Sequence, residues 1–127
     1  MENKNIDSIL KYLPYFKNRS NKFYRIDKEQ IMDPYIYSRK VRDFIKSIYK
    51  ENFTVVFDYP RWQMQALKYY KDSKLLKSAD IITLRKLLTL HIRKDRFVSG
   101  HLVEMIDSGH ILKILKRLKE IRDTIRD

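Results

Sequence analysis

The chain has 127 residues, no cysteine, only two glycines and three prolines, and 43% of its residues are hydrophobic. This length suits one domain with its own core, and the composition excludes a disordered chain, disulfide bridges, a thiolate nucleophile and cysteine-bound zinc. The formal net charge of +12 favours a polyanionic partner, with a merely lysine-rich surface as the alternative.

No sorting or membrane signal is recognisable in the sequence. The first residues, MENKNIDSIL, lack the basic start and the continuous apolar run of a secretory signal. No apolar run approaches the roughly 20 residues that a bilayer-spanning helix needs. We therefore expect a soluble, cytoplasmic protein that does not engage a membrane.

Residues 1–33 predict an N-terminal helix followed by a variable connection. The apolar residues at helical spacing are Ile6, Ile9, Leu10, Leu13 and Phe16. Pro14 is expected to end or bend this helix. Residues 17–33 are polar and indicate a long connection, in which KFYRI offers a short extended piece.

The middle of the chain predicts two helices around a short apolar segment. Ser38 is a good N-cap for the first helix, whose apolar stripe is Val41, Phe44, Ile45, Ile48 and Tyr49. The segment FTVVF, residues 53–57, predicts a short buried strand or an extended linker. Asp58 is expected to cap the next helix, and Trp62 is expected to anchor that helix in the core rather than to offer a stacking platform.

The C-terminal half predicts three more helices. The first is capped by Ser78 or Asp80 and carries the stripe Leu84, Leu87, Leu88, His91 and Ile92. The tripeptide Ser-Gly-His occurs at 99–101 and again at 108–110, so Gly100 and Gly109 predict helix breaks, with His110 at the second junction. The last helix carries Ile111, Leu115, Leu118, Ile121 and Ile125. We therefore predict a mainly α, single compact domain of five to six helices over residues 1–127, with at most a minor β element near 53–57.

Three stretches of the sequence carry a family resemblance: PYIYS, FDYPRWQ and LRKLLTLHIRKDRFVSGHLVEMIDSGHILKILKRLKEI. From Pro34 to Ile121 the chain resembles the domain-of-unknown-function family DUF6508 of small bacterial, archaeal and phage proteins, although Tyr59 stands where that family usually has tryptophan. The resemblance implies a family-like core at 34–121, leaves residues 1–33 outside and brings no activity with it. The positions that it marks are Asp58, Trp62, Arg93, Arg96, Gly100, His101, Gly109 and His110.

The densest group of polar residues is HIRKDRFVSGHLVE, residues 91–104. Here Arg96 precedes His101 with four residues between them, and Glu104 follows. All-α ribonucleases of the HEPN superfamily use an arginine and a histidine at such a spacing, because histidine exchanges a proton near neutral pH while arginine stabilises phosphoryl charge. Arg85 and His91 form a second pair of this kind. Phe97 and Lys86 stand where the superfamily commonly has a polar residue, which weakens both matches.

His91 lies on the apolar line of its helix, three residues after Leu88, and we expect it to be a hydrogen-bonded core residue. The alternative is a metal site formed with His101 and His110. Their separations of ten and nine residues are not a local ligand motif. We therefore expect no metal and no cofactor.

Basic residues of the last two long helices form the predicted nucleic-acid surface: Arg93, Lys94, Lys113, Lys116, Arg117 and Lys119. The leading hypothesis is a small, basic, non-enzymatic protein that engages DNA, RNA or a nucleic-acid-handling protein complex, in a phage or mobile-element setting such as counter-defence. One alternative is a metal-independent ribonuclease using Arg96, His101 and Glu104. Another is a structural adaptor or homodimer.

Overall fold

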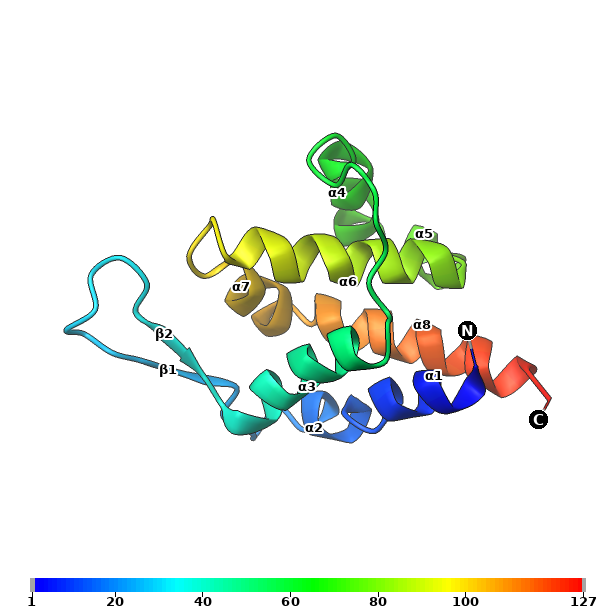
Figure 1. Cartoon of the computed structure of the whole chain (residues 1–127), viewed down its shortest axis with the longest axis horizontal. Coiled ribbons are helices and arrows are strands. Elements are labelled where there is room, and N and C mark those ends of the chain that lie inside the picture. Colours follow the sequence, from blue (N-terminus) through cyan, green and yellow to red (C-terminus); the bar gives the residue numbers. More distant parts are fainter. Residues whose placement is uncertain (1, 127) are drawn as a thin grey trace.

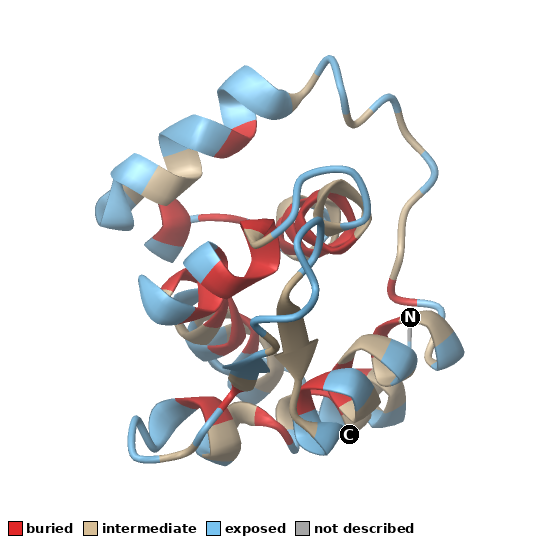
Figure 2. Cartoon of the chain, turned by 90° about the vertical axis from the view of Figure 1, so that its left-hand side faces the viewer, coloured by how far each residue is buried: buried red, intermediate tan, exposed pale blue. Residues whose placement is uncertain are grey.

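The apolar line of the last predicted helix becomes the centre of the fold. The computed structural model describes residues 2–126, and in it helix α8 (His110–Thr124) buries Ile111, Ile114, Leu115 and Leu118. Helices packed against α8 are α1 (Asn3–Leu10), α2 (Leu13–Lys17), α5 (Ser73–Lys77), α6 (Ile81–Asp95) and α7 (His101–Asp107). Figure 1 shows α8 among these helices, and Figure 2 shows the buried residues on their inward sides.

The remaining elements are α3 (Arg39–Lys50), α4 (Gln63–Lys71) and the strands β1 (Tyr24–Ile26) and β2 (Tyr35–Tyr37). The mainly α fold is confirmed. Residues 2–126 divide into more helices than the predicted five to six, because α2 starts anew beside Pro14 and Asp72 caps α5 separately. None of the helices in this part of the chain combines the length and the apolar character that crossing a bilayer requires.

Helices α3 and α6 begin where their capping residues predict. The Ser38 hydroxyl accepts a hydrogen bond from the Val41 amide at 3.2 Å, and Asp80, rather than Ser78, accepts one from the Thr83 amide at 2.8 Å. Such caps satisfy amide groups that have no partner within the helix, and each stabilises it by about 1 kcal/mol.

The predicted helix start at Asp58 is wrong. Helix α4 begins only at Gln63, and Asp58 accepts a hydrogen bond from the Arg61 amide within the preceding turn. Trp62 stands at the N-cap position, is partly buried, and packs against Phe57 and Tyr69.

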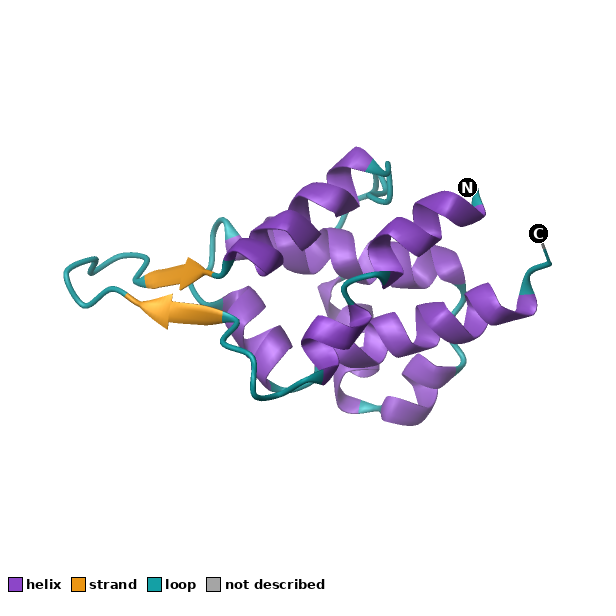
Figure 3. Ribbon diagram, turned by 90° about the horizontal axis from the view of Figure 1, so that it is seen from below, coloured by secondary structure: helices purple, strands orange, loops and turns teal. Residues whose placement is uncertain are grey.

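The two strands form an antiparallel hairpin in which Tyr24 pairs with Tyr37. Figure 1 and Figure 3 show this hairpin projecting from one end of the helical body. Strand β1 falls within the extended piece expected at KFYRI. The hairpin joins α2 to α3, so the connection predicted over residues 17–33 is largely one projecting arm.

Of the two alternatives predicted for residues 53–57, the linker is the one that forms, because the segment contains no strand although its residue types favour one. The Arg85 guanidinium donates hydrogen bonds to the carbonyls of Asn52, Phe53 and Thr54, at 3.0 to 3.2 Å. The Val55 amide donates to the Thr89 hydroxyl. Side chains of α6 therefore satisfy backbone groups that a neighbouring strand would otherwise bind.

Both glycines adopt the left-handed conformation where a helix begins. Gly100 has φ +82° and precedes α7, and Gly109 has φ +83° and precedes α8. A Cβ atom at Gly100 would lie 2.7 Å from Cε2 of Tyr35, whereas one at Gly109 would meet no described atom within 4 Å. Glycine at position 100 therefore allows both the left-handed turn before α7 and the close packing of the Tyr35 ring.

Candidate functional site

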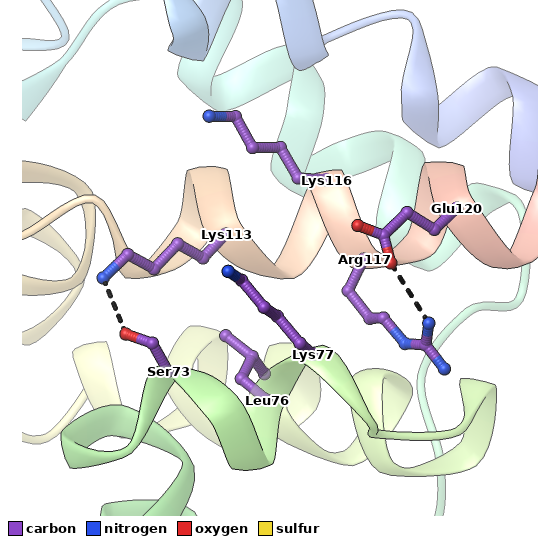
Figure 4. Close-up of a pocket in the computed structure, with 7 residues that line it drawn as sticks. All are labelled: Ser73, Leu76, Lys77, Lys113, Lys116, Arg117 and Glu120. Atoms are coloured by element: carbon purple, nitrogen blue, oxygen red, sulfur yellow. Dashed lines mark hydrogen bonds and ion pairs between the residues drawn. The ribbon is translucent and has the colours of Figure 1, made fainter.

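A cationic groove lies between α5 and α8. Because α8 buries its apolar line, Lys113, Lys116 and Arg117 remain together on a face that α5 borders. The groove has a volume of about 310 Å³, and Figure 4 shows its lining residues, Ser73, Leu76, Lys77, Lys113, Lys116, Arg117 and Glu120. Four cations and one carboxylate therefore line the groove.

Hydrogen bonds fix part of the groove. The Arg117 side chain donates from Nε to the Ala79 carbonyl at 2.8 Å and from one terminal nitrogen to Glu120 at 3.2 Å. The Lys113 ammonium donates to the Ser73 hydroxyl at 3.2 Å. Figure 4 shows Lys77 extending from α5 toward α8. Arg117 thus ties α8 to the connection between α5 and α6, and Lys113 ties α8 to α5. The lysines supply most of the available positive charge.

The other predicted nucleic-acid residues lie outside this groove. Lys119 forms an ion pair with Asp123 of the same helix, at 3.0 Å. Lys94 lines a different cavity, and Arg93 is a partly buried residue of α6. Of the predicted set, the three cations at 113, 116 and 117 therefore meet in the groove.

Lys77 is the groove residue that sequence reasoning missed. No helix is predicted from the sequence over residues 73–77, which form α5. Asp72 accepts hydrogen bonds from the amides of Lys74 and Leu75, and Leu76 is buried against the core. The signal was present in the sequence as an N-capping aspartate followed by Ser-Lys-Leu-Leu-Lys.

Arg96 and His101, the predicted catalytic pair, contact different elements. Arg96 donates a hydrogen bond to the Tyr49 hydroxyl at 3.2 Å and lies over the ring of the same tyrosine. A ring nitrogen of His101 lies 2.9 Å from Nδ1 of His91 on α6. Arg96 does not line the cavity that His101 lines.

Arg85, the arginine of the second predicted pair, is committed to the carbonyls of residues 52–54 and lies over the Phe53 ring. These contacts give it a structural role at the start of α6. Arg85 is therefore not the partner of His91 that the spacing of the two residues suggested.

The three histidines converge in the core, which the sequence did not predict. His91, His101 and His110 come from α6, α7 and α8 and are all buried. The His91 ring centroid lies 5.1 Å from that of His101 and 5.1 Å from that of His110. Tyr70 of α4 packs edge-on against His110 at 5.2 Å. Helix packing brings together residues whose spacing in the sequence carries no local signal.

Burial keeps the histidine cluster neutral at neutral pH. Desolvation, assisted by Lys94, lowers the pKa of His101 to about 4. Desolvation also lowers the pKa of His110 to about 4, with Lys113 as the next cause. The pKa of His91 lies well below its ordinary value because the ring is desolvated and neighbours the other two histidines.

Hydrogen bonding within the cluster is incomplete. One of the facing nitrogens of His91 and His101 must donate and the other accept. The Nε2 atoms of His91 and His110 are buried and have no partner among the described residues. Within residues 2–126, no group of three or more histidine or acidic residues is arranged to hold a metal ion.

A small cavity of about 160 Å³ borders this cluster. His101 and Glu104 both line it, together with His91 and Lys94. Glu104, the third predicted catalytic residue, is therefore near His101, with Lys94 as the cation on the same wall.

Comparison with known proteins assigns the chain to a family. The model described as "Family of unknown function (DUF6508)" matches residues 1–124. This range includes residues 1–33, which the resemblance noted in the sequence left outside. No curated protein and no solved structure matches the chain.

Proposed function

The chain belongs to DUF6508, a family of unknown function, and we propose that it is a non-enzymatic protein that binds nucleic acid through the groove between α5 and α8. The observation that carries this proposal is the convergence of Lys77, Lys113, Lys116 and Arg117 on one cavity. Lysine and arginine side chains grouped in this way match the negative charge of a nucleic-acid backbone. We propose that this binding takes place in the cytoplasm.

The chemistry of the groove supports binding rather than catalysis. It contains no histidine and one carboxylate, Glu120, which already accepts a hydrogen bond from Arg117. Lysine ammonium groups hold phosphates as point charges without needing a fixed geometry. A groove of this kind neutralises backbone charge and reads no base sequence.

The histidine cluster gives little support to ribonuclease activity. A general acid must be protonated at working pH, whereas the pKa of His101 is lowered to about 4. Arg96, which would stabilise phosphoryl charge, is engaged by Tyr49. The cavity shared by His101, Glu104 and Lys94 is the one observation that favours cleavage.

The proposal is tested by fluorescence polarisation with labelled duplex DNA and labelled single-stranded RNA at low salt. The variant Lys77→Glu/Lys113→Glu is expected to weaken binding by about tenfold or more, because two attractive contacts become repulsive. The matched control is Lys50→Glu/Lys68→Glu, which changes the net charge equally at two exposed positions outside the groove.

Equal affinities of the groove variant and the control variant would contradict the proposal, because net charge alone would then explain binding. The recovered RNA is also run on a denaturing gel. Intact RNA is expected, and fragments that disappear in the His101→Ala variant would instead support the ribonuclease alternative.

A further inference from the structure

A second cationic cavity lies at the base of the β1–β2 hairpin. Its volume is about 420 Å³, and its cations are Lys22, Arg25, Arg39 and Arg42. They come from the chain before β1, from β1 itself and from the first turn of α3. No acidic side chain lines this cavity. Four positive charges in a lining without an acidic side chain favour an anionic ligand with several charges.

The four cations are available to a ligand. All are exposed, and Arg39 approaches the Asp43 carboxylate at only 4.0 Å while its side chain remains 89% exposed. Within residues 2–126, no ion pair joins Lys22, Arg25 or Arg42 to a carboxylate. Exposed ion pairs of the Arg39 kind contribute little and exchange readily for another anion.

The hairpin is fixed on the helical body, so these cations share one frame. The Tyr37 hydroxyl donates to the Asp95 carboxylate at 3.0 Å, and the Tyr24 hydroxyl donates to Asp107 at 2.8 Å. Asp95 also accepts from the Leu102 amide at 2.9 Å, which joins the hairpin to the start of α7. The Tyr24 and Tyr37 side chains themselves line the cavity.

The loop at the tip of the hairpin is mostly polar but carries two adjacent, highly exposed apolar side chains. Ile31 is 93% exposed and Met32 is 91% exposed, in a loop that Figure 3 shows extending beyond the strands. Beside it, Asp33 accepts a hydrogen bond from the Ser99 hydroxyl at 3.0 Å, near exposed Phe97 of the α6–α7 connection. Exposed apolar side chains grouped in this way mark an interaction surface.

We propose that the hairpin is a second nucleic-acid contact specific for duplex DNA, in which the basal cations hold phosphates and the tip enters a groove. A two-stranded ribbon fits the major groove of B-form DNA, whereas the major groove of duplex RNA is too narrow for side chains to read. Apolar side chains at such tips can also insert between base steps. This inference rests on the proposed function and names its ligand.

The test compares two hairpin variants by fluorescence polarisation with labelled duplex DNA. Arg25→Glu/Arg42→Glu changes two exposed cations of the base, and Ile31→Ser/Met32→Ser changes the tip. The control is again Lys50→Glu/Lys68→Glu, and circular dichroism checks that each variant is folded. We expect the base variant to bind about tenfold more weakly than the control and to lower the salt slope by about 2. The tip variant is expected to weaken binding with the salt slope unchanged.

Hairpin variants that bind like the control, while Lys77→Glu/Lys113→Glu loses binding, would overturn this inference and leave the proposed function intact. Tighter binding of the parent chain to single-stranded RNA than to duplex DNA would also overturn it. Absence of DNA and RNA binding by the parent chain overturns both proposals. Binding only to vesicles that contain phosphatidylserine would assign the hairpin to a membrane surface instead.

Discussion

At the scale of single residues, the histidine cluster determines how the fold responds to acid. Protonating any one of the three rings would place a charge in the core, near Lys94 or Lys113. In the unfolded chain the same rings titrate near the ordinary histidine value of 6.5. Burying these histidines in neutral form therefore costs little at neutral pH. In acid it lowers the free energy of unfolding, because the unfolded chain can bind protons that the folded chain cannot.

The free energy of unfolding is expected to fall as the pH drops from about 6.5 to about 4. In this range the unfolded chain binds protons at His101 and His110 and the folded chain does not, because their folded pKa is about 4. His110 alone corresponds to about 3 kcal/mol across this range. Urea denaturation at a series of pH values measures the change.

His110→Leu is the matched variant for this prediction, because the Nε2 atom that it removes has no partner among the described residues. Its unfolding free energy is expected to vary less with pH than that of the parent chain. Carboxylates titrate in both chains, so the difference between the two profiles isolates the histidine. Parallel profiles would show that His110 titrates normally in the folded state.

Residue identity predicted some of these features and not others. The place of His91 on an apolar stripe indicates the core, and the structure buries it. The three cations of α8 share a face because of their spacing along one helix. The meeting of three histidines depends on how α6, α7 and α8 cross. The position of Lys77 in the groove likewise depends on the packing of α5 against α8. The spacing of residues within one segment therefore predicts neither the histidine cluster nor the place of Lys77.

At the scale of elements, regular apolar stripes with good caps predicted α3, α6 and α8. The segment 53–57 misled because β-branched and aromatic residues report only a preference for extended backbone. The backbone of this segment forms hydrogen bonds with the Arg85 and Thr89 side chains of α6. The sequence does not show which distant side chains will bind a given stretch of backbone. The hairpin was missed in part because strands of three residues carry almost no periodic signal.

The starts of α7 and α8 make the two glycines a matched pair for a stability test. Gly109→Ala is expected to cost about 1 kcal/mol, because alanine disfavours a positive φ. Gly100→Ala is expected to cost about 2 kcal/mol or more, because its Cβ atom would also press on the Tyr35 ring. Urea denaturation of each variant measures both costs.

The additional cost at Gly100 should disappear when Tyr35 is shortened. In a Tyr35→Leu background, Gly100→Ala and Gly109→Ala are expected to have similar effects. Equal losses of unfolding free energy for the two glycine variants in the parent chain would mean that Tyr35 moves away from the added Cβ atom without loss of stability. The close approach of Tyr35 would then not constrain Gly100.

At the scale of the whole molecule, two separate cavities each gather four cations. Figure 1 shows the hairpin at one end of the longest axis and α5 and α8 extending toward the other. Each cavity presents four cations to solvent, within a chain of net charge +12. Under the proposed function, a long polyanion would contact both cavities, and its affinity is expected to depend strongly on salt.

The most direct test of nucleic-acid binding is a polarisation titration of the parent chain with labelled duplex DNA at a series of potassium chloride concentrations. Three phosphate contacts are proposed in the groove, at Lys77, Lys113 and Lys116, and they correspond to a slope of about −3 for the logarithm of affinity against the logarithm of salt. The hairpin would make the slope steeper. A slope of about −3 or steeper is predicted, and an affinity independent of salt, or no binding at low salt, would contradict the account.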